Sequence, residues 1–131
     1  MDTIANLLTS LKNASMVSKE TIELPYSKIS EEILKLCQET GFIKGVKVFK
    51  HKDSVFKGLS VDLAYFEDGK AKISEAKRVS KPGRRIYRGS NELKDERKQY
   101  GLTVVSTSRG LMSISDAKKK HLGGELVCEI Y

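Results

Sequence analysis

The first half of the chain alternates between helical and strand-like hydrophobic patterns. Apolar residues recur every three or four positions from Ile4 to Leu11, which predicts a helix over residues 3–17 capped by Asp2 or Thr3. A second amphipathic helix is expected to begin after Ser27 and to end at Gly41. Strands are expected over residues 21–24, 42–50 and 58–66. The predicted order of this half is α-β-α-β-β.

The second half is predicted to be mostly β with one main helix. A Pro82-Gly83 turn leads into a short strand, and a helix is expected from Ser90 or Asn91 through Tyr100. The remaining expected elements are a strand over 102–107, a short strand or turn over 110–114, about two helical turns over 115–120 and a final strand over 124–131. The predicted fold class is therefore α/β plus α+β, in two closely packed small lobes.

A turn signal, Glu-Asp-Gly at 67–69, divides these halves, and the charge balance changes at the same place. Residues 1–66 carry nine lysines and eight acidic residues, a net charge of +1, whereas residues 67–131 carry fifteen basic and nine acidic residues, a net charge of +6. We therefore expect an N-terminal lobe over 1–66 and a C-terminal lobe over 67–131. All six arginines lie in the second lobe: Arg78, Arg84, Arg85, Arg88, Arg97 and Arg109. Arginine suits phosphate and base recognition because its planar fork donates several hydrogen bonds and stacks on flat rings.

Composition excludes several classes of protein. The sequence has no apolar run long enough for a membrane span, and its amphipathic start lacks the pattern of a secretory signal, so we expect a cytoplasmic protein without a membrane partner. Cys37 and Cys128 are far apart and are expected to be buried and reduced. With only His51 and His121 to add, no zinc-ligand spacing is present, so neither a metal site nor a cofactor is predicted.

Three adjacent hydroxyls, Ser106, Thr107 and Ser108, precede Arg109 in the sequence VVSTSRG. A hydrolase would need a base beside one of them, and no nucleophile-elbow motif surrounds any of the three. A turn in which the hydroxyls bond their own backbone stays open as a structural alternative. The functional alternative is a recognition loop, because hydroxyls both donate to and accept from bases and ribose 2′-OH groups while Arg109 meets phosphate.

A basic segment around an aromatic residue forms the second candidate. In RVSKPGRRIYRG, residues 78–89, the cations Lys81, Arg84 and Arg85 surround a tight turn, and Tyr87 follows it. The cations suit phosphates, and the ring suits stacking on an unpaired base. The alternative for Tyr87 is a core residue with its hydroxyl at the rim.

Further candidates lie near the end and near the start of the chain. Gly123-Gly124 allows a close backbone approach or a plain hairpin turn, and Glu125 is expected to hold the recognition loop or to accept from a base amino group. In the first lobe, Asn13 and Lys28 lie near helix ends, from which they could reach phosphates.

Taken together, six stretches resemble the bacterial small-subunit ribosomal protein eight family. They are IANLLTSLKNA, PYSK, GFI, RVSKPGRRIY, GLTVVSTSRGLMS and GGELVCEIY. They occur in order across the whole chain, and the series as a whole is specific where each piece alone is weak. His121 and Lys118 depart from the family pattern, which commonly has a small residue or glycine and an arginine at these positions.

The resemblance implies a fold of two associated lobes and a non-catalytic structural role. It implies direct binding to the central domain of small-subunit ribosomal RNA (rRNA), at a helix with an irregular core, and a part in assembling the subunit. Neighbouring small-subunit ribosomal proteins are the implied protein partners, and the protein's own messenger RNA is a further candidate. Carried over by position, the RNA-contacting residues would be Ser106, Thr107, Ser108, Arg109, Tyr87, Arg84, Arg85, Lys81, Gly124, Glu125, Thr3, Asn13 and Lys28.

Two other classes compete with this interpretation. A small enzyme could use the arginines as a clamp for an anionic substrate, but the sequence has no recognisable nucleophile–base pair or pair of catalytic carboxylates. A protein–protein adaptor could pair its final strand, as an exposed edge, with a partner chain. Its binding would be largely insensitive to salt, whereas binding to RNA phosphates weakens steeply as salt rises.

Overall fold

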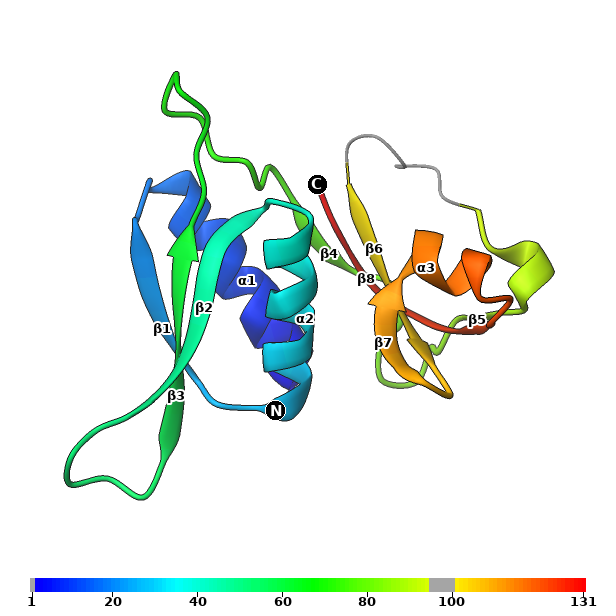
Figure 1. Cartoon of the computed structure of the whole chain (residues 1–131), viewed down its shortest axis with the longest axis horizontal. Coiled ribbons are helices and arrows are strands. Elements are labelled where there is room, and N and C mark those ends of the chain that lie inside the picture. Colours follow the sequence, from blue (N-terminus) through cyan, green and yellow to red (C-terminus); the bar gives the residue numbers. More distant parts are fainter. Residues whose placement is uncertain (1, 95–100) are drawn as a thin grey trace. The chain divides into compact units, whose positions relative to one another are not determined.

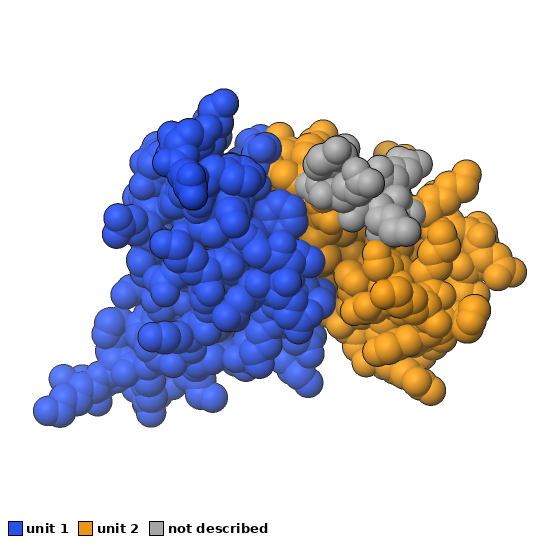
Figure 2. Space-filling model, turned by 45° about the horizontal axis from the view of Figure 1, so that its top comes forward, with its two compact units in different colours: residues 1–74 blue, residues 75–131 orange. Residues whose placement is uncertain are grey.

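The computed structural model describes residues 2–94 and 101–131. The chain forms two compact units, Met1–Ser74 and Glu75–Tyr131, which Figure 2 shows in different colours. Both units combine helix with antiparallel sheet, which confirms the predicted mixed α/β fold class. Each unit is described by itself below.

The first unit places two helices on one side of a three-stranded sheet (Figure 1). Its elements are α1 (Thr3–Met16), β1 (Thr21–Pro25), α2 (Lys28–Glu39), β2 (Ile43–Lys50) and β3 (Lys57–Leu63). The sheet order is β1-β3-β2, with both pairs antiparallel. This is the predicted α-β-α-β-β order.

Local sequence explains where these helices begin. Asp2 is the N-cap of α1, since its side chain accepts a hydrogen bond from the Ala5 backbone N–H at 3.3 Å, and Thr3 is already helical. Ser27 caps α2 in the same way through the Ser30 N–H. The apolar faces of the helices and the sheet form one core, whose fully buried members include Leu11, Ile33, Leu34, Leu59 and Val61.

The second unit is a twisted antiparallel sheet with one short α-helix among its described residues. Its elements are β4 (Ala76–Arg78), β5 (Tyr87–Arg88), the 3₁₀-helix η1 (Ser90–Glu92), β6 (Leu102–Thr107), β7 (Gly110–Ser113), α3 (Ile114–Lys119) and β8 (Gly124–Ile130). The strand order is β4-β8-β6-β7, and β5 pairs with β8 as well. Val105 and Met112 pack with Ile114 and Ala117 of α3 and with Leu93, so α3 covers this part of the sheet.

The structure differs from the sequence prediction at the helix expected near residue 90 and at the final strand. The helix expected from Ser90 or Asn91 through Tyr100 is a single 3₁₀ turn that ends at Glu92, because Leu93 turns to an extended backbone and buries its side chain in the α3 core. Residues 95–100 of that predicted helix lie outside the described residues. The final strand β8 is not an exposed edge, since β6 lies on one side of it and β4 and β5 on the other. This removes the structural basis of the adaptor alternative.

The division between the units falls after Ser74, whereas the sequence suggested 66/67. The turn at 67–69 is closed within the first unit, because Tyr65 and Ala71 form a β-bridge and the Phe66 N–H donates to the Lys70 carbonyl at 2.8 Å. A turn signal thus marked a hairpin within one unit, which local sequence cannot distinguish from a connection between units.

Candidate nucleic-acid interface

Three paired strands of the second unit bring the main candidates into one row. Tyr87 of β5 pairs with Glu125 of β8, and Glu125 pairs with Ser106 of β6. Directly paired residues of antiparallel strands point to the same face of a sheet, so these three side chains share one face. Their sequence neighbour Val105 points the other way, into the core under α3. Segments separated by many residues in the sequence therefore present one continuous polar row.

Tyr87 is at the exposed end of this row. Its side chain is 63% exposed, which excludes the alternative of a core tyrosine. An exposed ring held on a paired strand offers a flat surface with a fixed direction. The ring is thus accessible to a ligand, and stacking on a base stays a prediction for it.

Two glycines allow the strands to come together here. A Cβ atom on Gly124 would collide with the Ser106 carbonyl oxygen and would lie 3.2 Å from the Cα of Thr107. A Cβ on Gly123 would lie 2.6 Å from the Arg88 carbonyl oxygen. The Gly-Gly pair is therefore required by close backbone approach on both sides of β8, and the alternative of a plain hairpin turn is wrong.

The Ser-Thr-Ser segment contains the turn between β6 and β7, and its hydroxyls have different roles. The Thr107 hydroxyl donates to the Gly110 carbonyl at 2.9 Å and accepts from the Arg109 N–H at 3.1 Å. Gly110 closes the turn at φ +106°, a conformation that favours glycine. The structural alternative thus holds for Thr107, which fixes the turn. Ser106, Ser108 and Arg109 are exposed, and their role in recognition stays a prediction.

A second turn presents the arginines. Lys81 and Arg84 exchange backbone hydrogen bonds of 3.0 and 2.9 Å around Pro82-Gly83, and Gly83 has φ +81°, as the third position of a type II turn requires. Lys81, Arg84 and Arg85 are all exposed. The turn therefore directs several cations to solvent beside the row of Tyr87, Glu125 and Ser106.

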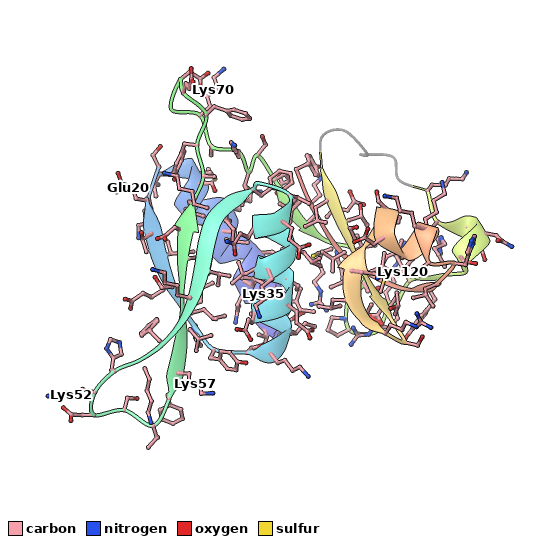
Figure 3. All side chains as sticks on the ribbon, in the orientation of Figure 1. Glu20, Lys35, Lys52, Lys57, Lys70 and Lys120 are labelled. Carbon is pink, nitrogen blue, oxygen red and sulfur yellow. The ribbon has the colours of Figure 1, made fainter. Side chains whose placement is uncertain are left out.

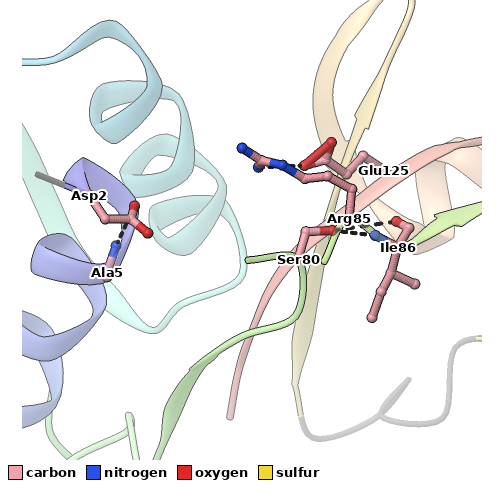
Figure 4. Close-up of polar contacts among 6 residues, drawn as sticks. All are labelled: Asp2, Ala5, Ser80, Arg85, Ile86 and Glu125. Atoms are coloured by element: carbon pink, nitrogen blue, oxygen red, sulfur yellow. Dashed lines mark hydrogen bonds and ion pairs between the residues drawn. The ribbon is translucent and has the colours of Figure 1, made fainter. Parts of the chain in front are cut away.

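One polar contact joins this arginine segment to β8, and a second closes the segment on itself (Figure 4). The Arg85 Nη1 donates to Glu125 Oε1 at 3.3 Å. Ser80, which is buried, accepts from the Ile86 N–H at 3.0 Å. Glu125 thus pairs with a cation of the arginine segment, and its role in holding the Ser-Thr-Ser loop or in accepting from a base stays a prediction. Sequence reasoning missed Ser80, and only its position before a Lys-Pro-Gly-Arg turn hinted at it.

The first-unit candidates lie on another part of the chain. Thr3 is the first residue of α1, Lys28 is the first residue of α2, and Asn13 lies in the last turns of α1. All three are exposed. All three belong to the first unit, whereas the row of Tyr87, Glu125 and Ser106 belongs to the second.

The chemistry of the interface is that of hydrogen bonding, cationic attraction and stacking. His51 belongs to the first unit and His121 to the second. Over residues 2–94 and 101–131, no group of three or more His, Cys, Asp or Glu side chains could hold a metal ion. No helix within these ranges is both long and apolar enough to cross a membrane.

A buried thiol lies in the middle of the sheet below the interface. Burial raises the pKa of Cys128 in β8 from an ordinary 9.0 to about 12, against a smaller lowering by the nearby Arg78 charge. Cys37 of α2 is also buried, and both cysteines are free, as expected. Neither thiol is placed for nucleophilic chemistry, since reactivity requires an accessible thiolate.

Comparison with known proteins agrees with this picture. The family model described as ribosomal protein S8 matches residues 2–131. Proteins named small ribosomal subunit protein uS8 from Helicobacter pylori (strain Shi470) and Helicobacter acinonychis (strain Sheeba) are each 48% identical over 130 residues, covering 99% of this chain and 98% of the relative. The protein of the same name from a Nitratiruptor species is 43% identical over 133 residues, with the same coverage. The chain therefore belongs to the ribosomal protein S8 family, whose members are structural, non-enzymatic proteins of the small ribosomal subunit.

Proposed function

We propose that this protein binds the central domain of small-subunit rRNA directly and helps to organise assembly of the subunit. Its place of action is the ribosome in the cytoplasm, beside neighbouring small-subunit proteins. The observation that carries the proposal is the row of Tyr87, Glu125 and Ser106 across β5, β8 and β6, flanked by exposed arginines. The family membership supports the ribosomal setting.

The row suits an irregular RNA helix better than a regular one. An A-form helix displays 2′-hydroxyls and base edges in a wide, shallow minor groove, and unpaired or tripled bases expose further edges. Ser106 and Ser108 are exposed hydroxyls that donate and accept, and Tyr87 is an exposed ring. We assign hydrogen bonds with bases and ribose to the two serines and stacking or a sugar contact to Tyr87.

The exposed cations are assigned to attracting the RNA and fixing its orientation on the protein. Lys81, Arg84 and Arg109 are assigned to backbone phosphates, which fix the orientation of the RNA without reading its sequence. Arg85 is also assigned to phosphate, with Glu125 holding its side chain in place. Gly124 keeps β6 and β8 close. Thr107 maintains the turn that carries Ser106 and Ser108. Additional phosphate contacts from Thr3, Asn13 and Lys28 belong to the same proposal.

The direct test is fluorescence anisotropy of the full chain with a hairpin copied from the central domain of the host rRNA. A scrambled hairpin is the control, and both are titrated at low and near-physiological salt. We expect tight binding of the true hairpin alone at near-physiological salt, because specific contacts persist where purely electrostatic ones weaken. Equal, salt-labile binding of both hairpins would contradict the proposal.

A variant tests the assignment of the loop. Ser106→Ala is expected to weaken hairpin binding by about 1–3 kcal/mol if its hydroxyl is buried against RNA. Unchanged affinity would remove Ser106 from the interface. The same titration with the leader of the protein's own messenger RNA tests that second candidate partner, because the row would accept any RNA with a similar irregular helix.

A further inference from the structure

The connection between β2 and β3 carries two adjacent apolar side chains in solvent. Val55 is 81% exposed and Phe56 is 79% exposed, although residues of these types are normally buried. They lie in the loop that joins the two strands at one end of the first unit (Figure 1). The row of the second unit does not include this loop, so its exposure calls for a separate explanation.

Local hydrogen bonds and a ring contact link residues within this loop. The Ser54 N–H donates to the His51 carbonyl at 3.0 Å, and the Phe56 N–H donates to the Ser54 hydroxyl at 3.1 Å. At the base of the loop, the Phe49 ring packs over Gly58 and meets the His51 ring edge-on, with centroids 5.0 Å apart. The Phe56 backbone is therefore fixed while its ring stays free, which lowers the entropy lost when a ligand binds the ring.

The segment that carries the exposed ring is basic. The sequence from 50 to 57 is KHKDSVFK, with three lysines and one histidine against a single acid. Lys52 lies at the far end of the loop and Lys57 at the start of β3 (Figure 3). Lys57 also lies over the Tyr26 ring, with 5.3 Å between its Nζ and the ring centroid. A polyanion with flat apolar groups is complementary to this arrangement.

We propose that this hairpin tip, residues 50–57, is a second RNA contact, at which an unpaired base stacks on Phe56 while Lys50, Lys52 and Lys57 meet the flanking phosphates. Proteins that bind single-stranded nucleic acid combine aromatic rings, on which bases stack, with positive charge that follows the backbone. Two apolar side chains fall far short of the roughly 800 Å² that each partner buries in a stable protein interface, whereas one ring matches one base. The inference rests on the proposed RNA-binding function and extends it to residues 50–57, to which that function assigns no contact.

The chain has no tryptophan, so a single introduced tryptophan reports on its own surroundings. We would prepare the full chain as Phe56→Trp and, as a matched control, as Phe66→Trp. Phe66 is also an exposed aromatic residue of the first unit, 56% exposed, and it also has a lysine near its ring, Lys72 at 5.5 Å. The probe is a single-stranded oligoadenylate, added before and after saturation with the central-domain hairpin.

We expect the oligoadenylate to quench the tryptophan of Phe56→Trp, because a stacked base quenches indole emission, and to leave that of Phe66→Trp largely unchanged. Saturation with the central-domain RNA hairpin should not remove the quenching, since none of the contacts assigned to that RNA involves residues 50–57. Equal quenching in both variants, or none in Phe56→Trp, overturns the tip proposal. Failure of the central-domain hairpin to bind specifically, with the tip still quenched, overturns only the assignment of the second unit.

A loss-of-contact variant completes the test. In the otherwise unaltered chain, Phe56→Ala should weaken oligoadenylate binding by roughly tenfold or more, as expected for the loss of one stacked base. Because Phe56 is exposed, the variant should fold normally, and its affinity for the hairpin should stay the same. Unchanged oligoadenylate affinity, together with weaker uptake into subunits that contain the neighbouring proteins, would assign the tip to a protein partner and overturn the RNA contact.

Discussion

Gly124 and Ser106 lie on paired strands with no room between them for a side chain on Gly124. A Cβ atom there would collide with the Ser106 carbonyl oxygen and lie 3.2 Å from the Cα of Thr107. Both neighbouring atoms belong to the backbone, so they can yield only if β6 and β8 separate. The distance between β6 and β8, which carry Ser106 and Glu125 of the proposed RNA-binding row, therefore depends on position 124 having no side chain.

We expect Gly124→Ala to lower the free energy of unfolding by about 1–3 kcal/mol, the usual cost of overpacking, and to weaken RNA binding as well. Urea denaturation followed by circular dichroism measures the first effect. Gly45→Ala is the control, because Gly45 also lies in a strand but has no atom within 4 Å of its missing Cβ. Similar losses in both variants would show that glycine in a strand, and not close approach, explains the effect.

Substitutions of Thr107 and Ser106 should affect stability differently, because Thr107 bonds within its turn and Ser106 is assigned to RNA. Thr107→Val removes a hydroxyl that makes two hydrogen bonds within the β6–β7 turn, so we expect it to lower the free energy of unfolding by about 1–2 kcal/mol. Thr107→Ser keeps the hydroxyl and should retain most of the stability. Ser106→Ala should alter stability by less than about 0.5 kcal/mol, because Ser106 is exposed. A stability loss in Ser106→Ala equal to that of Thr107→Val would contradict this division of roles.

Periodic apolar patterns and caps predicted the elements of the first unit because those signals are local. The side chains of Asp2 and Ser27 cap the helices that follow them, as their positions before apolar repeats indicated. In the second unit, long-range packing overrode local preference at Leu93, whose burial under α3 ends the helical turn begun at Ser90. The apolar pattern could not show this, because it does not say which core a residue joins.

The candidate site was predicted by residue type but not by geometry. Hydroxyls, arginines and a glycine pair indicated segments that the second unit brings together. The pairing of Tyr87 with Glu125 and of Glu125 with Ser106 joins residues far apart in sequence. Register of this kind is set by tertiary contacts and has no local signature. The role of Thr107 in its own turn was open for a related reason, since a hydroxyl in a turn serves either the backbone or a ligand.

Arg85 should contribute to RNA binding mainly through phosphate. We expect Arg85→Ala to weaken hairpin binding and to make the slope of log K against log salt less negative by about one phosphate contact. Lys35→Ala is a matched control, because Lys35 is also an exposed cation in an ion pair, with Glu31 on α2. Its salt slope should equal that of the unaltered chain. An unchanged slope in Arg85→Ala would show that Glu125, and not phosphate, takes up the charge of Arg85.

The buried thiol of Cys128 predicts a pH dependence of stability. Burial raises its pKa to about 12 in the folded chain, whereas the unfolded thiol ionises near 9.0. The folded state therefore keeps a proton that the unfolded state loses. The contribution of Cys128 to the free energy of unfolding is therefore fully present below about pH 9. As the pH rises toward 12, this contribution falls by up to about 1.4 kcal/mol per pH unit.

Urea midpoints between pH 8 and pH 11 test this dependence. Cys128→Val removes the ionisable group at similar volume, so its stability should fall less steeply with pH than that of the unaltered chain. In the unaltered chain, neither Cys128 nor Cys37 should react with a disulfide reagent at pH 8 until urea unfolds the protein, because both are buried. Parallel pH profiles for the two proteins would mean that other groups dominate the alkaline loss of stability.

His121 ends α3 in a backbone conformation that suits glycine. Its φ is +55°, and its N–H donates to the Lys118 carbonyl at 3.2 Å, as at the first position beyond a helix C-terminus. Residues with a Cβ atom are sterically strained in this left-handed region, whereas glycine is not. We therefore expect His121→Gly to raise the free energy of unfolding by up to about 1 kcal/mol. Lys120→Gly is the control, since Lys120 has φ −88° and gains nothing from glycine. If Lys120→Gly were as stable as His121→Gly, the left-handed conformation would not be what limits the end of α3.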